Sequence, residues 1–249
     1  MVPPGEEAAW LWVGTAGMLA GTAYFAAKWW AADTARTRGF YLVTVAIPAL
    51  AFASYLSMAL GYGVVEVVTG GGRRVVYWAR YAEWLFTTPL LLVDLALVAG
   101  ARRSTVGTLV GLDAAMIAAG LAATLNTEAV LGLDVGGVRL VWWGVSTGFF
   151  LVLLYYLFGT LSAQARDAPA DARRLFRTLR NLTAGLWVAY PVVWLVGTEG
   201  LGYLGLYWET AAFVALDLAA KVGFGAVLLR SHAALESAVA ARSGGVPAD

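Results

Sequence analysis

Residues 207–230 have the sequence YWETAAFVALDLAAKVGFGAVLLR, an apolar stretch long enough to cross a bilayer that nevertheless contains a lysine. Lys221 follows Asp217 by four residues, so the two side chains lie about one helical turn apart and can pair. About 13 Å of helix separates Lys221 from Arg230, too far for a lysine side chain to snorkel to the surface. Because an unpaired ammonium at that depth costs at least about 2.5 kcal/mol, this lysine with its carboxylate indicates a functional site more than a structural ion pair.

A lysine in an apolar pocket also has a particular chemistry. Desolvation disfavours its ammonium form and leaves a nucleophilic amine that condenses with aldehydes. This predicts a Schiff base between Lys221 and a bound carbonyl compound. A protonated imine is a buried cation that needs a counter-ion, and Asp217 is placed to supply one.

The composition is that of an integral membrane protein. The 249 residues are 60% hydrophobic and only 13% charged, with a mean hydropathy of +0.72. The formal charge of +1 gives no support to nucleic-acid binding, and the absence of cysteine excludes disulfides and thiolate metal sites. We expect no metal site, because the single histidine, His232, follows the last apolar stretch as a solvated tail residue.

Long apolar segments alternate with short polar ones, which predicts an all-α membrane protein with a seven-transmembrane-helix bundle. The chain is expected to form a single domain over residues 1–249, with 231–249 as a cytoplasmic tail. The predicted helices are 8–30, 40–62, 77–99, 106–125, 138–161, 175–196 and 203–230.

Between the second and third helices, the sequence VVEVVTGGGRRVVY over residues 64–77 has β-branched residues on both sides of three glycines. This pattern predicts a short β-hairpin outside the membrane. The hairpin is expected on the extracellular side.

The positive charges define the orientation. The side predicted to hold the N-terminus has only Arg73, Arg74 and Arg139 in its connections. The other side holds Lys28, Arg36, Arg38, Arg102, Arg103, Arg166, Arg173, Arg174, Arg177, Arg180, Arg230 and Arg242. Since cytoplasmic loops carry the excess of lysine and arginine, the N-terminus is expected outside and the C-terminus in the cytoplasm, in a multi-pass protein of the cell membrane.

Titratable groups recur inside the predicted helices. Glu83 and Asp94 are eleven residues apart, nearly three turns, so they share a helical face about 16 Å apart. With Arg80, Glu199 and Glu209 on the outer side, and with Asp217 beside the lysine, they form a line of groups across the bilayer that is typical of a proton relay. The alternative is that Arg80, Glu83 and Asp217 form only a neutralising salt-bridge cluster, which leaves Asp94 without a cationic partner.

The motifs RYAEWLFTTPLLLVDLALV at 80–98 and LDLAAKVGFG at 216–225 closely resemble those of the microbial rhodopsins, specifically the haloarchaeal bacteriorhodopsins. Similar stretches are AFASYLSMALGYG at 51–63, RLVWWGVSTGFF at 139–150 and RNLTAGLWVAYPVVWLVGTEG at 180–200. The resemblance covers essentially all seven predicted helices. It implies a light-driven outward proton pump rather than an enzyme, with all-trans retinal bound to Lys221 as a protonated Schiff base.

The resemblance also implies roles for individual residues. Glu83 corresponds to the proton acceptor, Asp94 to the donor, and Arg80, Glu199 and Glu209 to the release group. Thr87 is expected to hydrogen-bond the acceptor, Thr44 the donor and Thr88 Asp113, while Tyr55 and Tyr190 hydrogen-bond Asp217. The residues expected to bind retinal, besides Lys221, are Trp84, Trp187, Tyr190, Trp143, Met116, Phe150, Ser146, Pro191, Thr88, Asp113 and Tyr55. Family members often form trimers in lipid, which implies a homo-oligomer.

One residue departs from the family pattern, since the pumps usually carry aspartate where this chain has Glu83. The extra methylene moves the carboxylate by about 1 Å, where Coulomb interactions are strong. The acceptor pKa, the colour and the transfer rate are therefore expected to differ. Intrinsic carboxyl pKa values differ by only about 0.4, so pumping is expected to survive.

Other functions remain as alternatives. Glu83 argues against a chloride pump, whose relatives have a neutral residue there. A sensory (phototaxis) rhodopsin that signals to a membrane transducer is the main alternative, because receptor and pump share the same photochemistry. Against it, Asp94 is retained and Ala220, rather than threonine, precedes the lysine. The relay motifs argue against a retinal-binding enzyme or a G-protein-coupled receptor.

Overall fold

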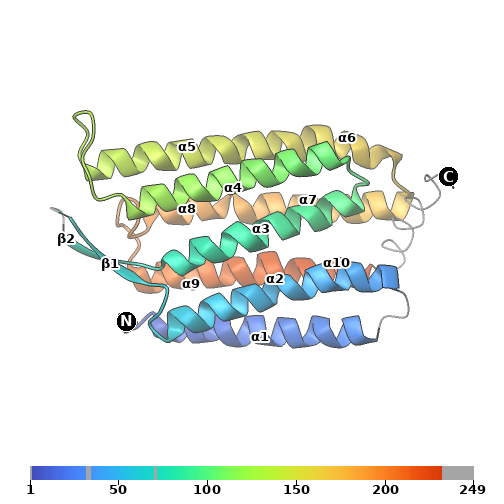
Figure 1. Ribbon diagram of the computed structural model, residues 1–249, viewed down its shortest axis with the longest axis horizontal. Helices are drawn as coiled ribbons and strands as arrows, with labels where there is room; N and C mark the ends of the chain where they lie inside the picture. The colour runs from blue at the N-terminus through green and yellow to red at the C-terminus, as the bar shows by residue number, and fades with distance from the viewer. Residues whose placement is uncertain (1, 32–34, 70–71, 232–249) are drawn as a thin grey trace.

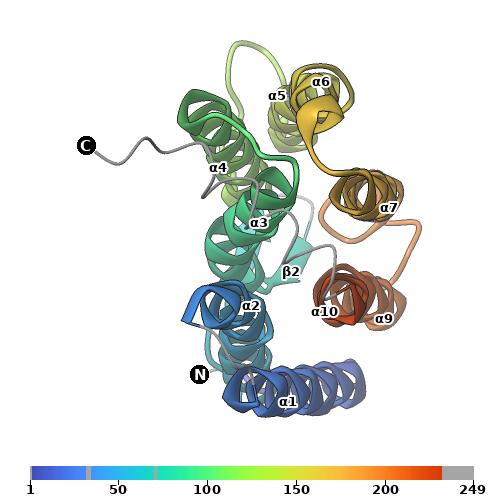
Figure 2. The same cartoon turned by 90° about the vertical axis from the view of Figure 1, so that its right-hand side faces the viewer.

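The computed structural model describes residues 2–31, 35–69 and 72–231. His232, Arg242 and the predicted tail, apart from Ser231, lie outside the described residues. The described chain forms a bundle of seven helical stretches running side by side (Figure 1). Seen end-on, each stretch lies next to its neighbour in the chain, and α1 packs against both α2 and α9 (Figure 2).

The first four stretches are single α-helices, and the last three are interrupted. The single helices are α1 (Ala8–Trp30), α2 (Ala35–Ala59), α3 (Trp78–Val98) and α4 (Arg103–Leu125). The fifth stretch comprises α5 (Val135–Tyr156), the π-turn η1 (Leu157–Leu161), α6 (Ser162–Gln164) and the 3-10 turn η2 (Ala165–Asp167). The sixth comprises α7 (Ala170–Trp187) and α8 (Ala189–Val196), and the seventh α9 (Leu206–Asp217), the π-helix η3 (Leu218–Gly223) and α10 (Phe224–Arg230).

Several helix boundaries differ from the predicted ones. α2 ends at Ala59 rather than 62, because Gly61 and Gly63 adopt positive φ angles of 81° and 65° that no helix accommodates. The sixth stretch begins at Ala170, five residues before its predicted start, because Pro169 precedes its first turn. The seventh begins at Leu206 rather than 203.

Six stretches of the described chain are long and apolar enough to cross a membrane. They are Tyr41–Ala59, Trp78–Val98, Arg103–Leu125, Val135–Asp167, Ala170–Val196 and Leu206–Arg230. α1 is not among these six, although it is 23 residues long and belongs to the bundle. The protein is therefore a multi-pass membrane protein with a seven-helix fold.

The predicted hairpin is confirmed. Strands β1 (Val65–Thr69) and β2 (Gly72–Val76) pair antiparallel, with Val65 opposite Val76. The hairpin lies at the end of the bundle where α1 and α9 begin (Figure 1). We call this the hairpin end, and the end where α10 finishes the far end.

α1 approaches the seventh stretch very closely. A Cβ atom on Gly17 would lie 2.6 Å from a methyl group of Leu218, and one on Gly21 would lie 2.6 Å from a methyl group of Val222. Real Cβ atoms do not make such contacts, so a larger residue at either position would have to displace the Leu218 or Val222 side chain. Small residues of this kind let two helices pack with their backbones close together inside a membrane.

Candidate functional site

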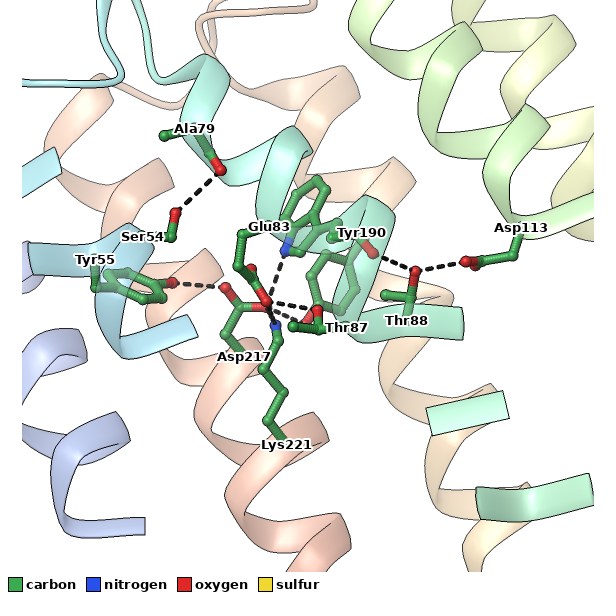
Figure 3. A network of polar contacts seen from close by, with 11 residues as sticks. Ser54, Tyr55, Ala79, Glu83, Thr87, Thr88, Asp113, Tyr190, Asp217 and Lys221 are labelled. Carbon is green, nitrogen blue, oxygen red and sulfur yellow. Dashed lines mark hydrogen bonds and ion pairs between the residues drawn. The ribbon is translucent and has the colours of Figure 1, made fainter. Parts of the chain in front are cut away.

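Lys221 lies in the π-helix η3 at the centre of a buried group of charges (Figure 3). Its ammonium group forms ion pairs with Asp217 and with Glu83, whose Oε1 is 3.5 Å from Nζ. The three side chains are at most 2% exposed. The pairing of Asp217 with Lys221 expected from their spacing is therefore present, and a second carboxylate from α3 joins it.

Asp217 is held by three hydrogen-bond donors from three helices in addition to the lysine. The Tyr55 hydroxyl donates to Oδ2 at 2.7 Å, while the Tyr190 hydroxyl and Trp84 Nε1 donate to Oδ1 at 2.9 Å and 3.1 Å. Both tyrosines lie where the resemblance implied. A buried carboxylate with this many donors is well stabilised as an anion.

Glu83 has a sparser environment than Asp217. Thr87, one turn later on α3, donates to its Oε1 at 2.5 Å, as the resemblance implied (Figure 3). Lys221 is its other polar partner among the described residues. Of the two carboxylates beside the amine, Glu83 therefore has fewer groups that favour its charge.

Arg80 does not join this cluster. Within the described chain it forms no ion pair with Glu83 or Asp217, and its buried Nε and Nη2 have no hydrogen-bond partner. Its guanidinium carbon instead lies 4.4 Å from the ring centroid of Phe213 and 5.8 Å from that of Tyr77. The alternative of a neutralising cluster that includes Arg80 is therefore wrong, because the lysine takes both carboxylates and the arginine packs on aromatic faces.

Two buried glutamates lie toward the hairpin end. Glu199 accepts hydrogen bonds from Tyr81 and, at 3.2 Å, from Thr124. Glu209 accepts from the backbone N–H of Thr198 at 2.7 Å and from its hydroxyl at 2.6 Å. These glutamates are 2% and 1% exposed.

Sequence reasoning missed the partners of these glutamates. Tyr81 and Thr198 are adjacent in sequence to predicted site residues, and that adjacency was the available signal. Thr124 comes from the end of α4 and gave no local signal. Its hydroxyl lies 2.7 Å from that of Tyr81 and accepts from Trp194 Nε1 at 2.9 Å.

Asp94 lies on the other side of Lys221, toward the far end, and is fully buried. The Thr44 hydroxyl interacts with this carboxyl group, and its oxygens have no other hydrogen-bond partner within the described chain. A large apolar cluster fills this half of the bundle, and it includes Leu91, Leu95, Leu153, Phe176, Leu179, Phe224 and Leu228. No ion pair of Asp94 occurs in the described part of the chain.

A cavity opens beside Lys221 with almost entirely apolar and aromatic walls. It is lined by the expected residues Trp84, Thr88, Met116, Trp143, Ser146, Phe150, Trp187, Tyr190 and Pro191. The residues not expected there are Tyr81, Leu91, Ile117, Gly120, Thr147, Trp194, Phe213 and Ala220. Local sequence patterns do not separate these from ordinary core positions.

Two residues expected at the pocket do not line the cavity. Tyr55 contacts Asp217 instead. Asp113 lies behind Thr88, whose hydroxyl is 2.6 Å from the Asp113 carboxyl and 2.7 Å from the carbonyl oxygen of Trp84. Both residues therefore belong to the layer of hydrogen bonds around the cavity wall.

Together, the fold and the site define a class: a helical membrane protein with a buried amine between two carboxylates, facing an aromatic cavity. Comparison with known proteins gives the family. Residues 6–235 match the family model described as bacteriorhodopsin-like protein. The chain is 53% identical to cruxrhodopsin-1 of Haloarcula argentinensis and 52% identical to bacteriorhodopsin-I of Haloarcula marismortui, each over the whole of both chains.

Solved structures agree with this match. The thermophilic rhodopsin of Rubrobacter xylanophilus has a TM-score of 0.85 and 43% identity, covering 94% of this chain and 99% of that chain. A cyanorhodopsin of Calothrix has a TM-score of 0.86 and 37% identity, with the same coverage. The chain belongs to the bacteriorhodopsin-like family, whose members bind retinal.

Proposed function

We propose that the protein is a light-driven outward proton pump that carries all-trans retinal on Lys221 as a protonated Schiff base. The observation that carries the proposal is the asymmetry around the Lys221 amine. Glu83 is 3.5 Å from Nζ and has one threonine donor, whereas Asp217 has three donors. Asp217 is thus held by more donors than Glu83, and in this proposal Glu83 is the carboxylate that accepts the proton.

The residues of the cavity fit retinal. A flat apolar chain suits walls of tryptophan, tyrosine and phenylalanine, and an aldehyde needs an amine at the wall. Trp84, Trp187 and Tyr190 all line the cavity that Lys221 enters. When bound, retinal supplies light absorption and a change of shape at the lysine nitrogen.

Glu83 is the acceptor in this proposal. A proton that leaves the Lys221 nitrogen reaches Oε1 of Glu83 over 3.5 Å, a gap that a small movement or one water closes. Thr87 holds that oxygen in place by its hydrogen bond. In this proposal Asp217 supplies the negative charge beside the Lys221 nitrogen while Glu83 holds the proton.

Asp94 is the donor that restores the proton to the Lys221 nitrogen. Its burial among apolar side chains and the lack of any ion pair favour the protonated form of a carboxyl group, which can then give up its proton. Eleven residues of α3 separate it from Glu83, about 16 Å along the axis, so donor and acceptor serve opposite sides of the amine.

The direction of transport follows from the orientation that the charges favour. By the positive-inside rule, the hairpin end with Arg73, Arg74 and Arg139 faces the outside. Glu83 passes its proton toward Glu199 and Glu209 at that end, while Asp94 faces the cytoplasmic end. Transport is then outward, and a protein of this kind acidifies the medium in light.

Light-driven pH change in vesicles tests the proposal. We expect Glu83→Gln to lose at least about 10²-fold of the pumping rate, because the acceptor is removed from an acid–base step, whereas Glu83→Asp keeps pumping. Glu66→Gln, an exposed hairpin glutamate, is the matched control. A protonophore should abolish every pH signal, and an undiminished Glu83→Gln variant would exclude the acceptor assignment.

The same assay separates a pump from a sensory receptor. A receptor bound to its transducer gives little net transport, whereas a pump acidifies the medium over many turnovers. The presence of Asp94 in the far half supports the pump, since a receptor has no need to reload the amine quickly.

We also propose a homo-oligomer in the membrane. Large apolar side chains are exposed on the outer faces of the helices, among them Trp12, Phe86 and Leu151. Such surfaces contact lipid or another copy of the chain. Chemical cross-linking in native-like vesicles should give trimers if the family tendency holds, and a monomer band alone would contradict it.

A further inference from the structure

A cleft at the hairpin end lies outside the site described above. It has a volume of about 810 Å³ and is bounded by strand β2, the start of α5 and the connection between α8 and α9. Its charged lining residues are Arg73, Arg74, Arg139 and Asp134. Three arginines around one open cleft mark a positive site on a protein whose net charge is only +1.

Two of the four charges are already engaged. Arg73 pairs with Glu66 at 2.9 Å on the exposed face of the hairpin. Asp134 caps α5 by accepting the backbone N–H of Gly137 at 2.8 Å. The remaining positive charge of the cleft belongs to Arg74 and Arg139.

Arg139 is 93% buried, and its Nε and Nη2 have no hydrogen-bond partner in the described part of the chain. Its guanidinium carbon lies 5.7 Å from the centroid of the Trp194 ring. A buried guanidinium with unmatched N–H groups is costly, and an anion is the partner that best satisfies it.

Arg74, on strand β2 of the hairpin, also has a guanidinium N–H group without a hydrogen-bond partner among the described residues. Its Nη2 donates to the carbonyl of Thr124 at 3.0 Å, but its buried Nε has no partner among the described residues. Burial lowers the pKa of the Arg74 guanidinium, and Glu199 is the strongest of the charges that oppose this shift. Neither Glu199 nor Glu209 lines the cleft or forms an ion pair with either arginine in the described chain.

We propose that this cleft binds a small oxyanion of the sulfate or phosphate class between Arg74 and Arg139. Guanidinium groups present parallel N–H donors that match two oxygens of such an anion, which a single lysine would not do. The hairpin lies at one end of the bundle (Figure 1), where a solute of the medium or a phosphate of a lipid headgroup could supply this oxyanion. This binding does not depend on the proposed transport or on light.

Equilibrium dialysis of the purified full-length protein against radiolabelled sulfate, in a neutral detergent and without competing anions, tests the site. We expect one saturable sulfate per wild-type chain. Arg74→Gln and Arg139→Gln should each weaken binding at least about tenfold, and Arg139→Lys less, because it keeps the charge but loses the fork. Arg103→Gln, an exposed arginine at the far end, is the matched control and should bind like the wild type.

Circular dichroism and gel filtration establish that each variant is folded, and Arg74→Gln covers the case in which the more buried Arg139 cannot be replaced. No saturable binding by the folded wild type, or full binding by the Arg74→Gln/Arg139→Gln double variant, would overturn the site. Vesicles of neutral lipid with and without an anionic phospholipid then separate the two sources. Equal sulfate binding in both supports a soluble anion, and loss of binding in the anionic vesicles would assign the cleft to a headgroup.

Discussion

The two halves of the bundle on either side of Lys221 are built in opposite ways. Toward the hairpin end, Glu199 accepts hydrogen bonds from the hydroxyls of Tyr81 and Thr124, and Glu209 accepts one from the hydroxyl of Thr198. Toward the far end, the buried carboxyl group of Asp94 lies among leucine and phenylalanine side chains of the described chain. The half toward the hairpin end thus contains several hydrogen-bonded groups that could accept a proton, whereas the far half relies on the Asp94 carboxyl group.

This difference teaches how a static fold can favour one direction. Buried polar networks can pass a proton along hydrogen bonds, whereas an apolar region excludes both water and charge. A proton released at the amine therefore finds partners on the hairpin side at once. In the proposed mechanism, reloading from the far side depends on Asp94, which would make leakage in the wrong direction slow.

Removing the amine that divides the two halves should have the largest effect. We expect Lys221→Ala to give no stable visible colour with retinal and no pumping, because the covalent bond cannot form. The chain has one other lysine, the exposed Lys28 at the far end of α1, so Lys28→Ala is the matched control and should colour normally. Absorption spectra of the purified variants measure this, and a Lys221→Ala protein with the wild-type colour would contradict the site.

Replacing the carboxyl group of Asp94, in the half toward the far end, should have the second-largest effect. Asp94→Asn removes the proton source there, and we expect recovery of the ground-state colour after a flash to slow by about 10²-fold, while the first proton is still released. Flash photolysis with a pH indicator measures both steps. The exposed Asp167→Asn is the control, and an unslowed recovery in Asp94→Asn would show that this half does not depend on one carboxyl.

Removing one hydrogen-bond donor from the half toward the hairpin end should slow proton release less, because several polar groups remain there. Tyr81→Phe removes one donor to Glu199 and leaves Thr124 in place, so we expect release to the medium to slow only severalfold. The net contribution of one such hydrogen bond, about 0.5–1.5 kcal/mol, corresponds to an effect of this size. Indicator-dye kinetics with the exposed Tyr155→Phe as control test this, and a loss as large as that of Asp94→Asn would contradict the contrast between the halves.

The smallest expected change is one of colour alone. Acidification should protonate Glu83, the carboxylate beside the amine that has fewer hydrogen-bond donors. Loss of a negative charge near a protonated nitrogen lets the charge spread on excitation, so the absorption band should move to longer wavelength. Glu83→Gln should start at the longer wavelength and show no such step, and a spectral titration that leaves the two proteins alike would remove Glu83 from the amine's surroundings.

Much of the site could be predicted because its contacts are local. Asp217 and Lys221 are one turn apart, so their pairing follows from helix geometry alone. The glycine-rich turn between β-branched residues likewise predicted the hairpin. Thr87 and Glu83 are also one turn apart, although it was the resemblance that pointed to their contact.

The contacts that could not be predicted join distant segments or depend on packing. Tyr81 reaches Glu199 over 118 positions of sequence. Arg80 has a long side chain whose direction depends on the rings of Phe213 and Tyr77, so its charge alone suggested an ion pair that it does not make. The π-helix around Lys221 has no sequence signal that distinguishes it from an α-helix.

The two tight glycine contacts of α1 have a mechanical consequence. Gly17 and Gly21 bring α1 directly against Leu218, three residues before Lys221, and Val222, the residue after it, and neither contact leaves room for a methyl group unless the neighbouring side chain moves. α1 therefore lies directly behind the segment that carries the amine. When the Lys221 side chain is displaced, the close contact with α1 resists movement in that direction. We therefore expect the displacement to pass toward the cavity and the helices on its far side.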